Sequence, residues 1–213
     1  MKPALRQRIP ALTAIAAVVV IPVACIGCGA PDQGDTGPGT TVSPVAVAPT
    51  GLRWASYQGV ELPFADQGPA RTDGPIVGGF EHSPAGAALA AIHATVRISV
   101  APDSDWAVIG HQMLAPGPGR DAWALARAQI SITTPITDGA PKILGYTLAQ
   151  YSPDTAAIDI YSLHPDNSLT RNHTQLTWQG GDWRLQLPDT PTTNLVAEVT
   201  APPADLIALT PPR

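Results

Sequence analysis

The chain has 213 residues, and its 12 Lys and Arg against 17 Asp and Glu give a formal charge of −5 at pH 7. Residues 1–28 contain three basic groups and no acidic ones, so the remainder carries a formal charge of −8. Proteins that bind nucleic acids usually present a basic face. The composition therefore argues against nucleic acid as a partner.

Residues 1–28 have the layout of an export signal. Three basic residues precede an uncharged run over residues 11–26, which ends beside Cys25 and Cys28. This run of about 16 residues is near the lower limit for crossing a bilayer core. We expect a signal peptide that leaves a lipid on Cys28, with Cys25 as the alternative, and thus an anchor on the extracytoplasmic face of a bacterial cell membrane. An uncleaved single-span anchor and plain secretion are the other interpretations.

The rest of the chain divides by composition. Residues 29–50 are glycine, proline, threonine and other small residues without an aromatic side chain, which is typical of a flexible tether. Residues 51–209 are predicted to form a single domain with one hydrophobic core, and residues 210–213 a short tail. Cleavage before Cys28 would leave this domain without a disulfide, so its stability must come from its core.

Residues 51–79 are rich in glycine and proline, and we expect extended, looping structure there. Ser83 followed by Pro84 is a strong signal for the start of a helix. Apolar residues then recur at helical spacing, which predicts a helix over residues 84–98 with one apolar stripe: Ala85, Leu89, Ile92 and Val96.

Two further helices are expected before the spacing of apolar residues changes from helical to strand-like. The first begins near Asp103 or Ser104, either of which is a good helix cap, and the second covers residues 119–130. A Pro-Gly-Pro-Gly segment at residues 116–119 separates them.

The C-terminal half is predicted to form strands over residues 143–151, 157–163, 170–178 and 183–187, because β-branched and aromatic residues alternate there. Gly180 and Gly181 predict a tight hairpin turn that places Trp178 opposite Trp183, with a polar, solvated second face. Residues 194–200 and 204–209 could add short elements. These elements make an α+β domain in which a curved antiparallel sheet wraps around the first helix.

The segment over residues 79–91, GFEHSPAGAALAA, and the ending over residues 178–185, WQGGDWRL, resemble exported proteins of actinobacterial conjugative elements with domains like nuclear transport factor two. The extracytoplasmic domains of type IV secretion assembly factors such as the TcpC family look similar. The resemblance covers residues 51–187 and implies a cone-shaped cystatin-like fold. It also implies a scaffold beside a DNA-transfer channel, whereas the lipoprotein-like leader here departs from relatives that have a transmembrane helix.

The five histidines do not show the spacing of a metal site. His93 follows the apolar stripe by one position, so we expect it at the edge of the core or exposed. Asp103, Asp105 and His111 could converge, but a helix cap is the simpler interpretation of Asp103. We expect no metal and no cofactor.

Some proteins with this cone-shaped fold are isomerases or dehydratases that use an Asp or His together with a Tyr. The residues that correspond to this chemistry are Asp159, Tyr146 and Tyr161. Asp159 and Tyr161 share one face of a strand, and a carboxylate in an apolar interior would act as a base. If Ile158 and Ile160 pack inward instead, Asp159 lies on the solvated face.

Three hypotheses follow for the function. The first is a membrane-tethered structural or protein-interaction domain without enzymatic activity, which contacts other envelope proteins as an accessory of conjugative DNA transfer or secretion. The second is an envelope lipoprotein that binds a small apolar ligand in the cone, which a sealed interior would contradict. The third is an isomerase-type enzyme that uses Asp159 with a Tyr or His in one cavity, which an outward Asp159 would contradict.

Overall fold

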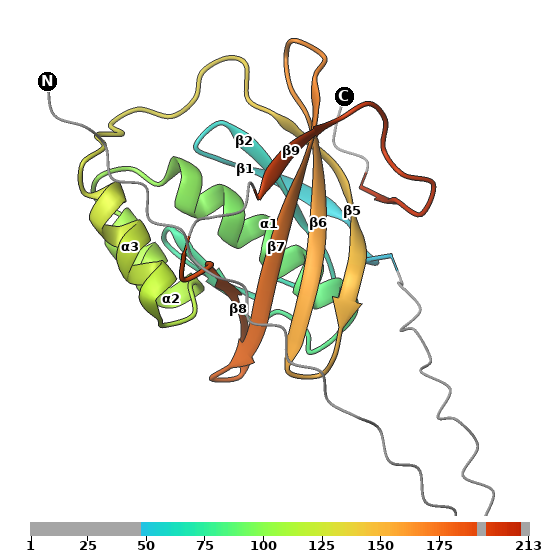
Figure 1. Cartoon of the computed structure of the whole chain (residues 1–213), viewed down its shortest axis with the longest axis horizontal. Coiled ribbons are helices and arrows are strands. Elements are labelled where there is room, and N and C mark those ends of the chain that lie inside the picture. The colour runs from blue at the N-terminus through green and yellow to red at the C-terminus, as the bar shows by residue number, and fades with distance from the viewer. Residues whose placement is uncertain (1–47, 191–194, 210–213) are drawn as a thin grey trace, which may run out of the picture. The chain divides into compact units, whose positions relative to one another are not determined.

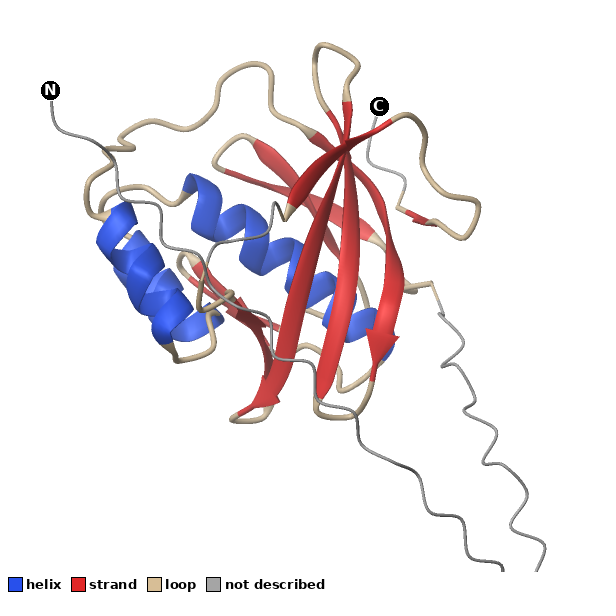
Figure 2. Cartoon of the chain, in the orientation of Figure 1, coloured by secondary structure: helices blue, strands red, loops and turns tan. Residues whose placement is uncertain are grey.

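A computed structural model describes residues 48–190 and 195–209. The predicted leader with Cys25 and Cys28, most of the predicted tether and the predicted tail lie outside these residues. Within the described part, helices and a curved, unclosed antiparallel sheet form an α+β fold, with one long helix lying along the sheet (Figure 1, Figure 2). No helix among the described residues has the length and apolar character needed to span a bilayer.

The glycine-rich region before the first helix forms two β-hairpins, so the predicted extended structure is confirmed and the predicted looping structure is wrong. Their strands are β1 (Arg53–Tyr57) with β2 (Val60–Phe64), and β3 (Arg71–Asp73) with β4 (Ile76–Gly78). Gln58, Gly59 and Gly74 have positive φ angles at the turns, which is the backbone that tight hairpin loops require. The glycines therefore make turns between short strands rather than a continuous loop.

The first helix, α1 (Pro84–Val100), begins where the sequence predicts. The Ser83 hydroxyl accepts a hydrogen bond from the Gly86 N–H at 3.2 Å, and Pro84 occupies the first turn. The helix is buried on most sides and not along one stripe only, because the β1–β2 hairpin and the sheet both pack against it. Its many alanines leave room for this close approach.

The next two helices are α2 (Trp106–Met113) and α3 (Pro118–Arg127). The prediction that Asp103 or Ser104 caps α2 is wrong, because the residue before this helix is Asp105. Asp103 instead accepts hydrogen bonds from the Arg127 guanidinium at 3.0 Å and from the Ser131 hydroxyl at 2.7 Å. Arg127 also donates to the Ile130 carbonyl, and α3 ends at Arg127 rather than at Ile130 as predicted.

The main sheet is antiparallel, with the strand order β10-β5-β6-β7-β8 and β9 also paired with β7. Its strands are β5 (Lys142–Tyr151), β6 (Thr155–Leu163), β7 (Leu169–Gln179), β8 (Asp182–Gln186), β9 (Val196–Val199) and β10 (Ile207–Ala208). The β7–β8 hairpin has the predicted register, with Trp178 opposite Trp183 and Leu176 opposite Leu185. Gly180 and Gly181 supply the positive φ angles of its turn.

One residue of this hairpin departs from the predicted solvated face. The Asp182 side chain is only 17% exposed. It accepts hydrogen bonds from the backbone N–H groups of Gly79 at 2.6 Å and Phe80 at 3.1 Å, and from Arg71 at 3.1 Å. Asp182 therefore ties the hairpin to the segment that precedes α1, a contact between positions about 100 residues apart that local periodicity does not reveal.

Candidate binding pocket

Two strands, β8 and β9, pair with the same edge of β7 and diverge near the middle of β7. β8 pairs with residues 175–179 of β7, whereas β9 pairs with residues 169–172. The chain leaves the sheet at Leu187 and is beside it again at Leu195, whose carbonyl accepts a hydrogen bond from the His173 N–H at 2.8 Å. A gap is left between β8 and β9.

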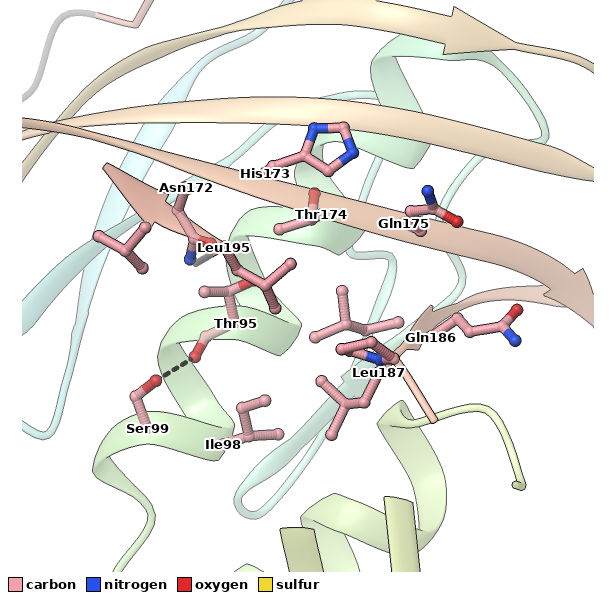
Figure 3. Close-up of a pocket in the computed structure, with 13 residues that line it drawn as sticks. Thr95, Ile98, Ser99, Asn172, His173, Thr174, Gln175, Gln186, Leu187 and Leu195 are labelled. Carbon is pink, nitrogen blue, oxygen red and sulfur yellow. Dashed lines mark hydrogen bonds between the residues drawn. The ribbon is translucent and has the colours of Figure 1, made fainter. Parts of the chain in front are cut away.

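A cavity of about 510 Å³ lies at this gap, against the last turns of α1 (Figure 3). We call it the pocket. Its lining comes from α1, β7, the end of β8 and the residues around the start of β9: Thr95, Ile98, Ser99, Asn172, His173, Thr174, Gln175, Leu185, Gln186, Leu187, Pro188, Leu195 and Val196. The volume is within the range of about 300–1,000 Å³ that is common for small-molecule sites.

The surface that the pocket presents is mainly apolar, although polar side chains are among its lining residues, and the described lining contains no Lys, Arg, Asp or Glu. Besides the exposed amides of Gln175 and Gln186, two polar side chains in it have unused hydrogen-bonding capacity within the described part of the chain. The Thr95 hydroxyl oxygen is buried there without a partner, and the Asn172 amide makes no hydrogen bond to a described residue. In Figure 3, Asn172, Leu195 and Thr95 lie together at one side of the pocket.

The segment after β8 that borders the pocket is held from outside by α3. Gly119, in the first turn of α3, lies so close to the carbonyl groups of Leu187 and Pro188 that a Cβ atom there would collide with them. Only glycine permits this approach. The wall of the pocket that follows β8 is thus supported by the start of α3.

The isomerase hypothesis requires Asp159 to share one cavity with Tyr146 or Tyr161. The structure places Asp159 and Tyr146 on opposite faces of the sheet. Ile158 and Ile160 belong to the core, so Asp159 points to the opposite face of the sheet, as the alternation indicates. Tyr146 lies opposite Ile160 on the core side, where burial raises its pKa. Asp159 lines none of the four main cavities among the described residues.

Asp159 has a histidine partner that the sequence analysis did not identify. Its carboxylate lies 2.6 Å from Nδ1 of His173 and 3.7 Å from the Arg171 guanidinium. The expectation that this face is solvated is wrong for Asp159 itself, which is buried. Counting back from the turn between β6 and β7 places Asp159 directly opposite His173, so the hairpin register was the signal that could have found this pair.

His173 takes part in the pocket through its backbone. Figure 3 shows its ring on the other side of β7 from Ile98 and Leu187, where it contacts Asp159. The ring is therefore held on the outer face of the sheet and is not directed into the pocket. The pocket and the Asp159–His173 pair occupy opposite faces of the same strand.

His93 is fully buried, and the prediction that it lies at the edge of the core or exposed is wrong. Its Nε2 donates a hydrogen bond to the Pro63 carbonyl at 2.8 Å, and its ring meets Phe64 edge-on at 4.9 Å. Burial lowers the pKa of His93 from 6.5 to about 3, so the ring is neutral at physiological pH. It acts as a core residue that joins α1 to β2.

Metal binding has no structural support within the described residues. No group of three His, Cys, Asp or Glu side chains there is arranged to hold a metal ion. His111 and Asp105 are not brought into such a group with Asp103, which is occupied by Arg127 and Ser131.

A family model described as a domain of unknown function (DUF8175) matches residues 24–202. The match includes the whole of the pocket. No curated protein and no solved structure matches the chain.

Proposed function

The chain belongs to the DUF8175 family, and from its pocket we propose that the domain binds a small, largely apolar molecule between α1 and the split edge of β7. The observation that carries this proposal is the cavity of about 510 Å³ whose surface is mainly apolar and whose described lining contains no Lys, Arg, Asp or Glu. Apolar surface that enters such a cavity leaves water, which contributes about 25 cal/mol for each Å² buried.

The proposed place of action is outside the cell. The basic and apolar leader, followed by Cys28 or Cys25 and a glycine- and proline-rich tether, supports a lipid-anchored domain on the extracytoplasmic face of the membrane. A helix lying along a curved sheet, with a cavity between them, supports the finer fold assignment to the cone of nuclear transport factor two. A ligand-binding domain on a tether could collect an apolar molecule close to the membrane surface.

The test uses Nile red, a neutral apolar dye whose fluorescence rises in apolar surroundings. We expect the purified protein to bind the dye, and Asn172→Phe to weaken that binding by about tenfold or more, because an aromatic ring at this position fills the pocket. Gln179→Phe is the matched control, since it adds the same ring to β7 outside the pocket. Equal binding by the two variants would contradict the proposal.

A protein-interaction role is the second candidate, and exposed apolar side chains near α2 and α3 favour it. Val108 is 40% exposed, Leu125 72% and Ile130 56%. Exposed apolar side chains mark a contact surface where they form a contiguous patch, and these three belong to α2, to α3 and to the segment directly after α3. In this proposal the domain is a non-enzymatic accessory of conjugative transfer or secretion that contacts other envelope proteins.

A variant on the surface of α3 distinguishes the ligand-binding role from the protein-interaction role. Leu125→Ser should change the free energy of unfolding by no more than about 0.5 kcal/mol and leave Nile red binding intact. If the protein-interaction role holds, the same variant recovers fewer envelope proteins than the wild type in an affinity purification from solubilised membranes. Recovery of the same envelope proteins by the variant and the wild type would count against a contact surface at Leu125.

A further inference from the structure

The charges around the pocket restrict the ligand. Among its described lining residues the only titratable side chain is that of His173, and this ring is turned to the other face of the sheet, where Asp159 holds it at 2.6 Å. Arg171, the nearest arginine along β7, also points to that face and lies 3.7 Å from Asp159. A carboxylate or phosphate in the pocket would thus be desolvated without a cationic partner, which is strongly unfavourable.

The helix that borders the pocket adds to this preference. Thr95, Ile98 and Ser99 all belong to the last turns of α1, which ends at Val100. The carbonyl groups at the C-terminal end of a helix carry a partial negative charge. Arg97 in the last turn offsets part of this charge, but the carbonyl groups still favour a ligand group that can donate a hydrogen bond.

The unused polar groups show where such a group would lie. The Thr95 hydroxyl oxygen is buried without a partner among the described residues, although the Thr95 carbonyl is occupied by the Ser99 hydroxyl at 2.8 Å. The Asn172 amide, which offers both a donor and an acceptor, lies nearby (Figure 3). A buried polar group without a partner is costly, and this applies to the Thr95 hydroxyl, so a ligand that satisfies Thr95 and also reaches the partly exposed Asn172 amide would be bound in preference to a plain hydrocarbon.

We infer that the pocket selects a neutral amphiphile, with its aliphatic part against Ile98, Leu187 and Leu195 and one hydroxyl group between Thr95 and Asn172. The inference rests on the proposed function and adds the chemical class of the ligand. It separates alcohols and other uncharged lipids, which fit the pocket, from free fatty acids, which are anionic at neutral pH.

The experiment compares octanol with octanoate, which have the same chain length and differ in the head group. Isothermal titration calorimetry with the purified protein at neutral pH should give an affinity for octanol at least about tenfold above that for octanoate. Equal or tighter binding of octanoate would overturn the ligand class while leaving the pocket as a binding site. Failure of octanol, octanoate and Nile red alike would overturn the proposed function itself.

Variants then locate the head group. Thr95→Val keeps the shape of the side chain and removes the hydroxyl, so the affinity for octanol should fall by about threefold to tenfold, whereas the affinity for toluene, which has no polar group, should not fall. Thr177→Val is the matched control, because Thr177 lies on β7 outside the pocket.

Equal losses of octanol and toluene binding in Thr95→Val would contradict the placement of the hydroxyl. If this variant fails to fold, as judged by circular dichroism, Asn172→Leu replaces it with the same expected discrimination between octanol and toluene.

Discussion

The first half of α1 lies in a closed core, whereas its last turns border the pocket. Ala87 to Ile92 are buried between the β1–β2 hairpin and the sheet. Near the other end the Thr95 hydroxyl has no partner in the described residues, and Ser99 is exposed. The first half is rich in alanine whereas the last turns contain Thr95, Arg97 and Ser99, and the covering of the two ends differs as well: continuous strand pairing at one end and the divergence of β8 and β9 at the other.

The largest expected effect comes from truncating one leucine in the closed core, Leu89 of α1, and one leucine that lines the pocket, Leu187 after β8. Leu89→Ala should lower the free energy of unfolding by about 2–5 kcal/mol, because a fully buried leucine leaves a cavity. Leu187→Ala should cost clearly less, since Leu187 already borders a cavity and is partly exposed. Chemical denaturation of both variants measures the difference, and equal losses would show that the pocket end is packed as tightly as the core.

Replacing Asp182 tests how much its hydrogen bonds to the segment before α1 contribute to the free energy of unfolding. Asp182→Ala removes the acceptor of three backbone N–H groups, those of Gly79, Phe80 and Trp183, and of Arg71, and hydrogen bonds to a charged group contribute about 1.5–3 kcal/mol. We expect thermal unfolding to show a loss of about 2 kcal/mol.

Arg71→Ala is the control for this contact. Its side chain is 72% exposed, and exposed ion pairs contribute only about 0–1 kcal/mol. A loss in Arg71→Ala as large as that in Asp182→Ala would mean that the ion pair, and not the backbone contacts, holds the hairpin.

The buried side chain of His93 makes the free energy of unfolding depend on pH. Its pKa is about 3 in the folded protein against 6.5 for a free side chain, so between these values the unfolded state binds a proton that the folded state does not. Stability therefore falls as the pH drops below 6.5, by about 1.4 kcal/mol per pH unit and by about 2 kcal/mol near pH 5. Below about pH 3 this contribution levels off, because both states are then protonated.

His93→Gln sharpens this prediction. Glutamine cannot titrate in this range, yet its amide can still donate to the Pro63 carbonyl that His93 contacts. Urea unfolding at a series of pH values should show a shallower loss of stability toward acid in the variant. Parallel curves for the two proteins would rule out His93 as the source.

Local patterns predicted the parts of the fold that depend on neighbours in sequence. Ser83 and Pro84 identify the start of α1, and Gly180 with Gly181 sets the register of the β7–β8 hairpin. The apolar stripe alone does not predict the burial of His93, because the β1–β2 hairpin covers a second side of α1. That hairpin was itself missed because its short strands are separated by glycine turns.

The pocket could not be predicted in the same way. It depends on two strands, β8 and β9, that pair with different parts of one edge of β7 and are joined by residues with no periodic pattern. Its polar groups, Thr95 and Asn172, are unremarkable in sequence and become a pair only when α1 and β7 pack together. By contrast, the Asp159–His173 pair follows from hairpin register and was within reach of sequence analysis.

The connection between β8 and β9 has a further consequence for the family. Because each strand is paired with β7 independently, residues inserted into or deleted from this connection need not disturb the ladder on either side. They would change the width of the opening instead. Family members with connections of different length are thus expected to share one scaffold and to admit molecules of different bulk, so that specificity can diverge without loss of the fold.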